Sequence, residues 1–86
     1  MEITKEKVEQ ITSELSGIVK SEGQPKGTQC QLKVKLDRHM ERACSIREYE
    51  EGGHYGFAIR LNPKRIRTEN KLEQHLNFCR EMLLGS

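Results

Sequence analysis

The stretch EEGGHYGFAIRLN, residues 50–62, decides the fold because it joins a tight turn to a strongly alternating strand. Glycine readily adopts the positive φ angles of two-residue hairpin loops, so EEGG predicts a hairpin turn. After the turn, larger apolar residues (Tyr55, Phe57, Ile59, Leu61) alternate with small or charged ones (Gly56, Ala58, Arg60). Such alternation is typical of a strand with one buried face and one solvent-exposed face.

Two more strands are predicted upstream of the turn. CQLKVKLD, residues 30–37, alternates strictly and directs Lys33 and Lys35 to the polar side. ACSIREYE, residues 43–50, alternates less regularly, with Cys44 and Ile46 pointing inward. Because short polar turns connect these segments, we expect three antiparallel strands with one buried face and one wet face.

Both ends of the chain have the spacing of amphipathic helices, with Thr4 and Thr68 placed as caps. The first helix has an apolar stripe of Val8, Ile11, Leu15, Ile18 and Val19. The second has a stripe of Leu72, Leu76, Cys79 and Leu83, widened by His75, Phe78 and Met82. We expect residues 1–86 to form a single α+β domain, a two-layer α-β-β-β-α sandwich. Both helices should cover one face of the three-stranded antiparallel sheet.

Composition narrows the class of protein. A chain of 86 residues supports one modest core. No apolar run approaches the roughly 20 residues of a membrane helix, and the N-terminus lacks the apolar centre of a signal peptide. Three cysteines, an odd number, argue against a disulfide framework. We therefore expect a cytoplasmic protein that does not contact a membrane.

Positive charge is concentrated in one part of the chain. The net charge is only +2, yet residues 60–71 hold five Lys or Arg residues against Glu69 alone. The strand residues Lys33, Lys35, Arg47 and Arg60 should share the outer sheet face. Gly56 and Ala58 should leave the middle of that face low and open. Arg65 and Arg67 precede the second helix, whose N-terminal N–H groups favour anions.

This pattern predicts a small, non-enzymatic binding domain that contacts a polyanion, with RNA or DNA as the leading partner. The candidate phosphate contacts are Lys33, Lys35, Arg47, Arg60, Lys64, Arg65 and Arg67. Two alternatives stay open. The charges could be an ordinary solvated surface, or the chain could be a protein-interaction or inhibitor module. Such a module would dimerise or bind a partner through the exposed sheet face or an edge strand.

Metal and catalytic motifs are missing from the sequence. His75 and Cys79 have a spacing that zinc-binding helices use, but Cys79 belongs to the core stripe and no Cys-x-x-Cys occurs. No serine is flanked by glycines, and Cys44 and Cys79 occupy inward positions that disfavour a thiolate. We expect no metal, no cofactor and no catalytic residue.

The segment IRLNP at residues 59–63, followed by EN at 69–70 and a helix, resembles the SprT-like zinc metallopeptidases. The resemblance covers about the last 27 residues, and it implies an active-site helix bearing His-Glu-x-x-His. Glu81 matches the catalytic glutamate, whereas Arg80 and Leu84 stand where the ligand histidines belong. The resemblance therefore implies a non-catalytic relative or fragment that holds no zinc. In element order alone, the chain also resembles the double-stranded RNA-binding domain and the RNA-binding subunits of the signal recognition particle.

Overall fold

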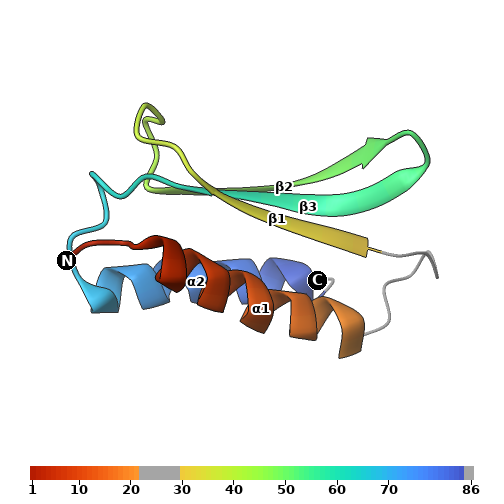
Figure 1. Cartoon of the computed structure of the whole chain (residues 1–86), viewed down its shortest axis with the longest axis horizontal. Helices are drawn as coiled ribbons and strands as arrows, with labels where there is room; N and C mark the ends of the chain where they lie inside the picture. The colour runs from red at the N-terminus through yellow and green to blue at the C-terminus, as the bar shows by residue number, and fades with distance from the viewer. Residues whose placement is uncertain (22–29, 85–86) are drawn as a thin grey trace.

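The computed structural model describes residues 1–21 and 30–84. Its elements follow the predicted order: α1 (Lys5–Ser21), β1 (Cys30–Leu36), β2 (Cys44–Glu51), β3 (His54–Leu61) and α2 (Glu69–Leu83). The two helices lie side by side in one layer beneath the sheet and leave its other face uncovered (Figure 1). The predicted two-layer α+β architecture is therefore confirmed for the described residues.

The sheet is mixed, so the prediction of a fully antiparallel sheet is wrong. The strand order is β1-β3-β2, with β3 parallel to β1 and antiparallel to β2. Residues 37–43 lead from β1 to the far edge of the sheet, and the β2–β3 hairpin then returns the chain to the middle (Figure 1). The strand β2 thus forms part of the connection between two parallel strands, a role that usually falls to a helix.

Burial explains why β3, and not β2, is the central strand. Phe57, Ile59 and Leu61 point inward from β3 and are almost fully buried. The inward positions of β2, in contrast, end in Glu48 and Glu50, which are both exposed. An edge position keeps these carboxylates in water, and inward-pointing charges on an edge strand also discourage pairing with another chain.

Local signals at the turn and the helix starts are confirmed. Gly52 and Gly53 have φ angles of 57° and 81°, as a hairpin loop with two left-handed residues requires. The Thr4 hydroxyl accepts a hydrogen bond from the Lys7 N–H at 3.1 Å. The Thr68 hydroxyl accepts one from the Lys71 N–H, also at 3.1 Å. Each cap stabilises its helix by about 1 kcal/mol.

The core lies between the helix layer and the sheet. Its buried members include the predicted α2 stripe of Leu72, Leu76, Cys79 and Leu83. Phe78 and Met82, which were expected to widen that stripe, are 54% and 41% exposed. These two residues lie one turn apart in α2 and outside its buried stripe. The prediction that they are core residues is wrong.

Candidate functional site

The register of the sheet places the basic strand residues on one face. Lys33 of β1 and Arg47 of β2 are both paired with Ala58, on either side of β3. In the next row, Lys35 is paired with Arg60. All four cationic side chains are exposed on the face opposite the helices. Their alternation predicted this shared face, and their role in binding stays a prediction.

Ala58 forms the floor of a shallow trough between Lys33 and Arg47. Adjacent strands lie about 4.8 Å apart, so the two flanking strands are about 10 Å apart. A hollow of about 290 Å³ opens there, lined by Lys33, Lys35, Arg47, Tyr49, Glu50, Glu51 and Ala58. Because Ala58 is short, long cationic side chains from both flanking strands can reach one anion between them.

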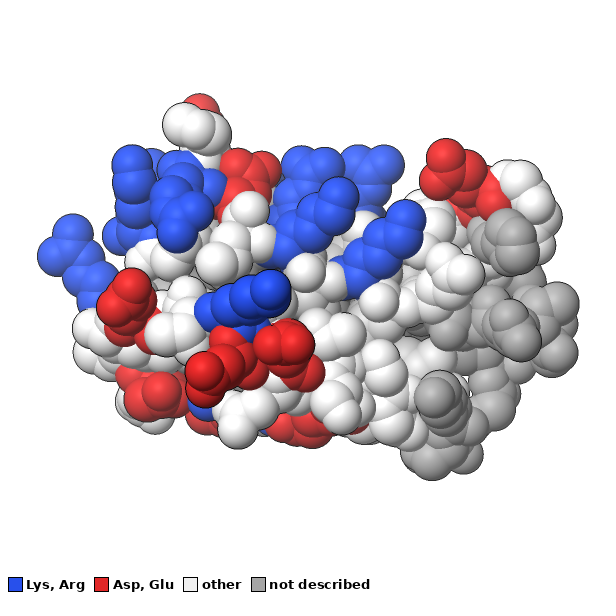
Figure 2. All heavy atoms as spheres, in the orientation of Figure 1, with Lys and Arg blue, Asp and Glu red and all other residues white. Residues whose placement is uncertain are grey.

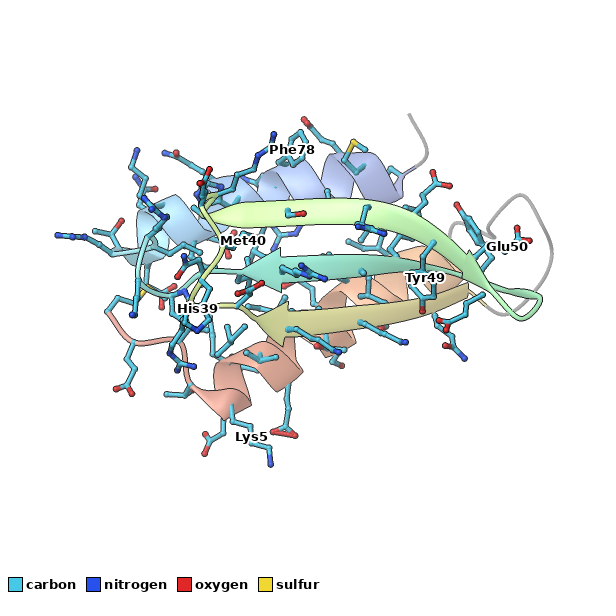
Figure 3. All side chains as sticks on the ribbon, turned by 90° about the horizontal axis from the view of Figure 1, so that it is seen from above. Lys5, His39, Met40, Tyr49, Glu50 and Phe78 are labelled. Atoms are coloured by element: carbon cyan, nitrogen blue, oxygen red, sulfur yellow. The ribbon has the colours of Figure 1, made fainter. Side chains whose placement is uncertain are left out.

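Tyr49 covers the end of this trough nearest the hairpin. An ideal Cβ built on Gly56 would lie 2.7 Å from Tyr49 Oη and 2.8 Å from its Cζ, so the phenol rests on the glycine backbone. Figure 3 shows the Tyr49 side chain reaching across the sheet from β2. An aromatic ring on a sheet glycine fills the space that the glycine leaves. The expectation that Gly56 is open is therefore wrong, and only Ala58 forms the low floor.

The surroundings of Tyr49 hold the ring in place but leave its hydroxyl unsatisfied. Lys33 Nζ lies over the ring, 5.1 Å from its centroid, which is a cation–π distance. Tyr49 Oη is buried and has no hydrogen-bond partner among the described residues. Because the phenol end of the ring packs on the Gly56 backbone and Lys33 Nζ lies over the ring, Tyr49 is already engaged in contacts within the sheet.

An acidic residue adjoins the basic face at the end of the sheet opposite the hairpin. Asp37 follows β1 directly, and its Oδ2 lies 3.7 Å from Arg60 Nη1. Asp37 Oδ1 also accepts a hydrogen bond from the His39 N–H at 3.0 Å, which shapes the start of the loop at residues 37–43. Arg60 stays half-exposed, so this ion pair only partly neutralises it.

Buried Asn62 joins that loop to the turn before α2. Its Nδ2 donates to the Met40 carbonyl at 2.6 Å, and its Oδ1 accepts the Lys64 N–H at 3.0 Å. Its own backbone N–H donates to the Ala43 carbonyl at 2.9 Å. Asn62 is only 2% exposed, so these bonds replace the water that its amide loses on burial.

Through Asn62, two basic segments that are distant in sequence adjoin each other. The turn contributes exposed Lys64, Arg65 and Arg67 around fully buried Ile66, and the loop contributes exposed Arg38 and Arg42. We call the cations of these two segments the basic end. Arg38 and Arg42 were not among the predicted contacts, because nothing in RHMER indicates that residues 37–43 fold against residues 62–67.

The N-terminus of α2 contributes less to anion binding than its sequence suggests. Thr68 already accepts the Lys71 N–H, and Glu69 places a carboxylate in the first turn. Glu69 also lies 3.8 Å from Lys7 Nζ of α1. Any anion contact of Arg65 and Arg67 would therefore rest on their own charge and not on a vacant helix terminus.

The segment that contains the sheet has a net positive charge, whereas the two helices together have a small net negative charge. Residues 30–68 carry nine Lys or Arg and five Asp or Glu, whereas α1 and α2 together carry five and six. Figure 2 shows Lys and Arg gathered along the sheet layer, with acidic residues mainly over the helices and at the hairpin. Such an uneven distribution gives one side of the molecule a positive potential despite the small net charge.

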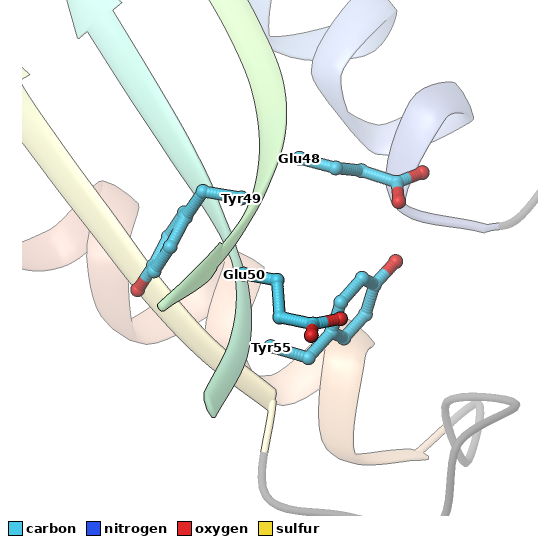
Figure 4. Close-up of a pocket in the computed structure, with 4 residues that line it drawn as sticks. All are labelled: Glu48, Tyr49, Glu50 and Tyr55. Carbon is cyan, nitrogen blue, oxygen red and sulfur yellow. The ribbon is translucent and has the colours of Figure 1, made fainter. Parts of the chain in front are cut away.

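The hairpin limits the basic face. Glu48, Glu50 and Tyr55 line a smaller hollow together with the backbone side of Tyr49. Figure 4 shows the three residues on one side of the strands and the Tyr49 ring on the other. Glu50 and Glu51 also line the hairpin end of the trough, and their carboxylates would repel an anion there, so the basic face is confined to the region from Lys33 to the basic end.

The described residues do not gather into a cluster of metal ligands. No three His, Cys, Asp or Glu side chains within residues 1–21 and 30–84 come together as a metal site. At the position where the metallopeptidase resemblance places a ligand, Arg80 donates to Glu14 at 2.7 Å and to Glu73 at 3.2 Å. These bonds connect α2 to α1, so Arg80 has a structural role in this chain.

Comparison with known protein families, with curated proteins and with solved structures found no match to this chain. Among the described residues, no helix has both the length and the apolar character needed to cross a membrane. The function must therefore be inferred from the geometry and charge of the chain itself.

Proposed function

We propose that this protein is a non-enzymatic nucleic-acid-binding domain that uses its outer sheet face and basic end. This proposal rests mainly on the register of the sheet, in which Lys33 and Arg47 are both paired with Ala58. One cation therefore lies on each side of a small residue. Lys35 and Arg60 extend the same face toward the basic end. Exposed cations arranged around a low floor suit the phosphates of a nucleic-acid backbone.

The proposed contacts are to phosphates and not to bases. On the described part of the outer face, Tyr49 is the aromatic side chain, and its ring already contacts the Gly56 backbone and Lys33. Proteins that bind single strands without sequence preference usually stack bases on free aromatic rings. We therefore expect this domain to bind duplexes at least as well as single strands, and with little sequence preference.

The test compares two charge-matched double variants in binding to a short duplex DNA and a short duplex RNA. Lys33→Gln/Lys35→Gln removes two lysines, two positions apart, from the outer sheet face. Lys5→Gln/Lys7→Gln removes two lysines with the same spacing from α1, in the other layer. Each pair lowers the net charge equally, so any difference reports position. Binding is measured over a range of salt concentrations.

Wild type should bind either duplex with an affinity that falls steeply as salt rises. The sheet-face variant should bind more weakly, and its salt slope should be smaller by about two, because two phosphate contacts are lost. The α1 variant should stay close to wild type. If both variants weaken equally, or if neither changes the salt slope, the sheet face is an ordinary solvated surface and the proposal fails.

A protein-interaction module is the second candidate, favoured by the exposure of Phe78 and Met82. Phe78 lies on the flank of α2 (Figure 3), Met82 follows one turn later in the same helix, and α2 contacts the edge strand β2. Exposed neighbouring apolar residues commonly mark contact surfaces. Glu48 and Glu50 oppose extension of the sheet at that edge. Light scattering tests this candidate: a dimer that Phe78→Ser/Met82→Ser converts to a monomer would support it.

A further inference from the structure

Two cysteines that are distant in sequence meet between β2 and α2. The Cys44 and Cys79 sulfur atoms are 3.6 Å apart, which is van der Waals contact for two thiols. We propose that Cys44 and Cys79 form a reversible oxidation site, in which a hydroperoxide converts the two thiols to a disulfide. This site is independent of the proposed nucleic-acid function, since neither sulfur belongs to the outer face.

The geometry favours bond formation within the folded chain. A disulfide has a sulfur–sulfur distance of about 2.05 Å, so each sulfur must move less than about 1 Å. Rotation about the two Cα–Cβ bonds can supply such a shift. Cys79 is fully buried in the core, whereas Cys44 begins the edge strand β2 and is half-buried. Cys44 is therefore the thiol that a small oxidant reaches first.

The Cys44 thiol is the more acidic of the two, as the first step of this reaction requires. The hydrogen bond between the two sulfur atoms lowers the pKa of Cys44, against the opposing effect of burial, so the expectation that its inward position disfavours a thiolate is wrong for Cys44. The same hydrogen bond, together with burial and the neighbouring Cys44 charge, raises the pKa of Cys79. The thiolate is the nucleophilic form, so Cys44 attacks the oxidant first while Cys79 is still protonated. Once Cys44 is a neutral sulfenic acid, its charge no longer raises the pKa of Cys79, and Cys79 gives up its proton as it attacks.

The reaction then proceeds in two balanced steps. The Cys44 thiolate attacks the terminal peroxide oxygen, an S–O bond forms, and the O–O bond breaks. The leaving hydroxide of hydrogen peroxide, or the alkoxide of an organic hydroperoxide, takes up a proton and leaves as water or an alcohol. This step leaves a sulfenic acid on Cys44. The Cys79 sulfur attacks the Cys44 sulfur, the S–S bond forms, and the S–O bond breaks. The displaced hydroxide leaves as water with the Cys79 proton. A small dithiol reverses the oxidation by thiol–disulfide exchange.

The third cysteine lies elsewhere in the sheet. Cys30 of β1 is paired with Tyr55, whereas Cys44 of β2 is paired with Leu61 at the other end of β3. Six positions along a strand correspond to about 20 Å. Of the three possible disulfides among the three cysteines, the fold therefore favours the one between Cys44 and Cys79. The chosen bond would fasten α2 to the edge strand and close a loop between residues 35 positions apart.

Peptide mapping of the unsubstituted chain tests the proposal directly. The folded protein is treated with hydrogen peroxide, the remaining thiols are alkylated under denaturing conditions, and the digest is analysed without reduction. We expect a peptide pair joined through Cys44 and Cys79, alkylated Cys30, and loss of two hydrogen atoms from the intact mass. Dithiothreitol should restore all three thiols. A bond through Cys30, overoxidation of Cys44, or alkylation of both Cys44 and Cys79 would overturn the proposal.

A second measurement separates the roles of the two thiols. In Cys79→Ser, oxidation should stop at the Cys44 sulfenic acid, which a dimedone-type reagent traps. In Cys44→Ser, buried Cys79 should react far more slowly with peroxide than Cys44 does in wild type. The oxidised wild type should also melt at a higher temperature than the reduced protein, because the disulfide restricts the unfolded chain. Equal reactivity of the two single variants would contradict the assigned order.

Discussion

The phenol ring of Tyr49 lies on the backbone of Gly56, its cross-strand partner in the outer face of the sheet. A side chain at position 56 would meet both this ring and the Gln31 carbonyl oxygen, which is 2.5 Å from an ideal Cβ. The carbonyl belongs to the neighbouring strand and cannot move without disturbing the sheet. Gly56 is thus required by packing from two sides, although its φ angle is available to any residue.

Gly56→Ala should destabilise the protein by about 1–3 kcal/mol, because the added methyl group overfills a closed space. Gly17→Ala is the matched control: nothing lies within 4 Å of its ideal Cβ, and it sits on an exposed face of α1. That change should stabilise the protein by about 0.5–1 kcal/mol through helix propensity. Urea unfolding measures both. A Gly56→Ala variant as stable as wild type would contradict the close packing of Tyr49.

Tyr49→Phe should leave stability unchanged or raise it by about 1 kcal/mol, since it removes a buried hydroxyl without a partner. The ring and its contacts with Gly56 and Lys33 remain. Because the hydroxyl makes no proposed phosphate contact, duplex affinity should also be unchanged. Thermal unfolding and a single binding titration check both expectations. A clear loss of stability would show that the hydroxyl is hydrogen-bonded in solution.

Asn62→Ala should cost about 2–4 kcal/mol, because it leaves the Met40 carbonyl and the Lys64 N–H without their side-chain partner. The control is Asn77→Ala, which removes an exposed amide that accepts a hydrogen bond from Arg80. Its cost should stay below about 1 kcal/mol. Hydrogen exchange should also show that residues 37–43 lose protection in the Asn62 variant. Similar costs at the two sites would argue against the bridging role of Asn62.

Asp37→Asn should strengthen duplex binding, because it removes the carboxylate 3.7 Å from Arg60. Asparagine keeps an oxygen that accepts the His39 N–H, so the loop should retain its shape. We expect affinity to rise several-fold and the salt slope to grow by at most about one unit. Asp37→Asn in an Arg60→Gln background should have a much smaller effect. An equal gain in that background would place the benefit elsewhere than on Arg60.

Substitutions in the turn at residues 64–67 test duplex binding and folding stability separately. Arg65→Gln/Arg67→Gln should weaken duplex binding and lower the salt slope by about two. It should change stability by no more than about 0.5 kcal/mol, since both side chains are exposed. Ile66→Ala, between them, should cost about 2–5 kcal/mol because Ile66 is fully buried. Unchanged binding in the double arginine variant would remove the basic end from the proposed interface.

The sequence by itself determined the elements of this protein and which residues of each strand face outward. Helical spacing, the threonines at positions 4 and 68, and the Gly52-Gly53 turn all act over a few residues. Their physical effects are therefore readable without knowing the fold. The same holds for Lys33, Lys35, Arg47 and Arg60, because side chains in a strand alternate whatever the neighbouring strands are.

Only the tertiary structure decided which strands became neighbours. Alternation is compatible with either strand order, and the choice of β3 as the centre follows from how completely each inward face can be covered. At the centre of the sheet, the inward side chains of Phe57, Ile59 and Leu61 are almost fully buried above the helix layer. At the edge, the carboxylates of Glu48 and Glu50 remain in water. That non-local balance set Lys33 opposite Arg47 and brought the Cys44 and Cys79 sulfurs into contact.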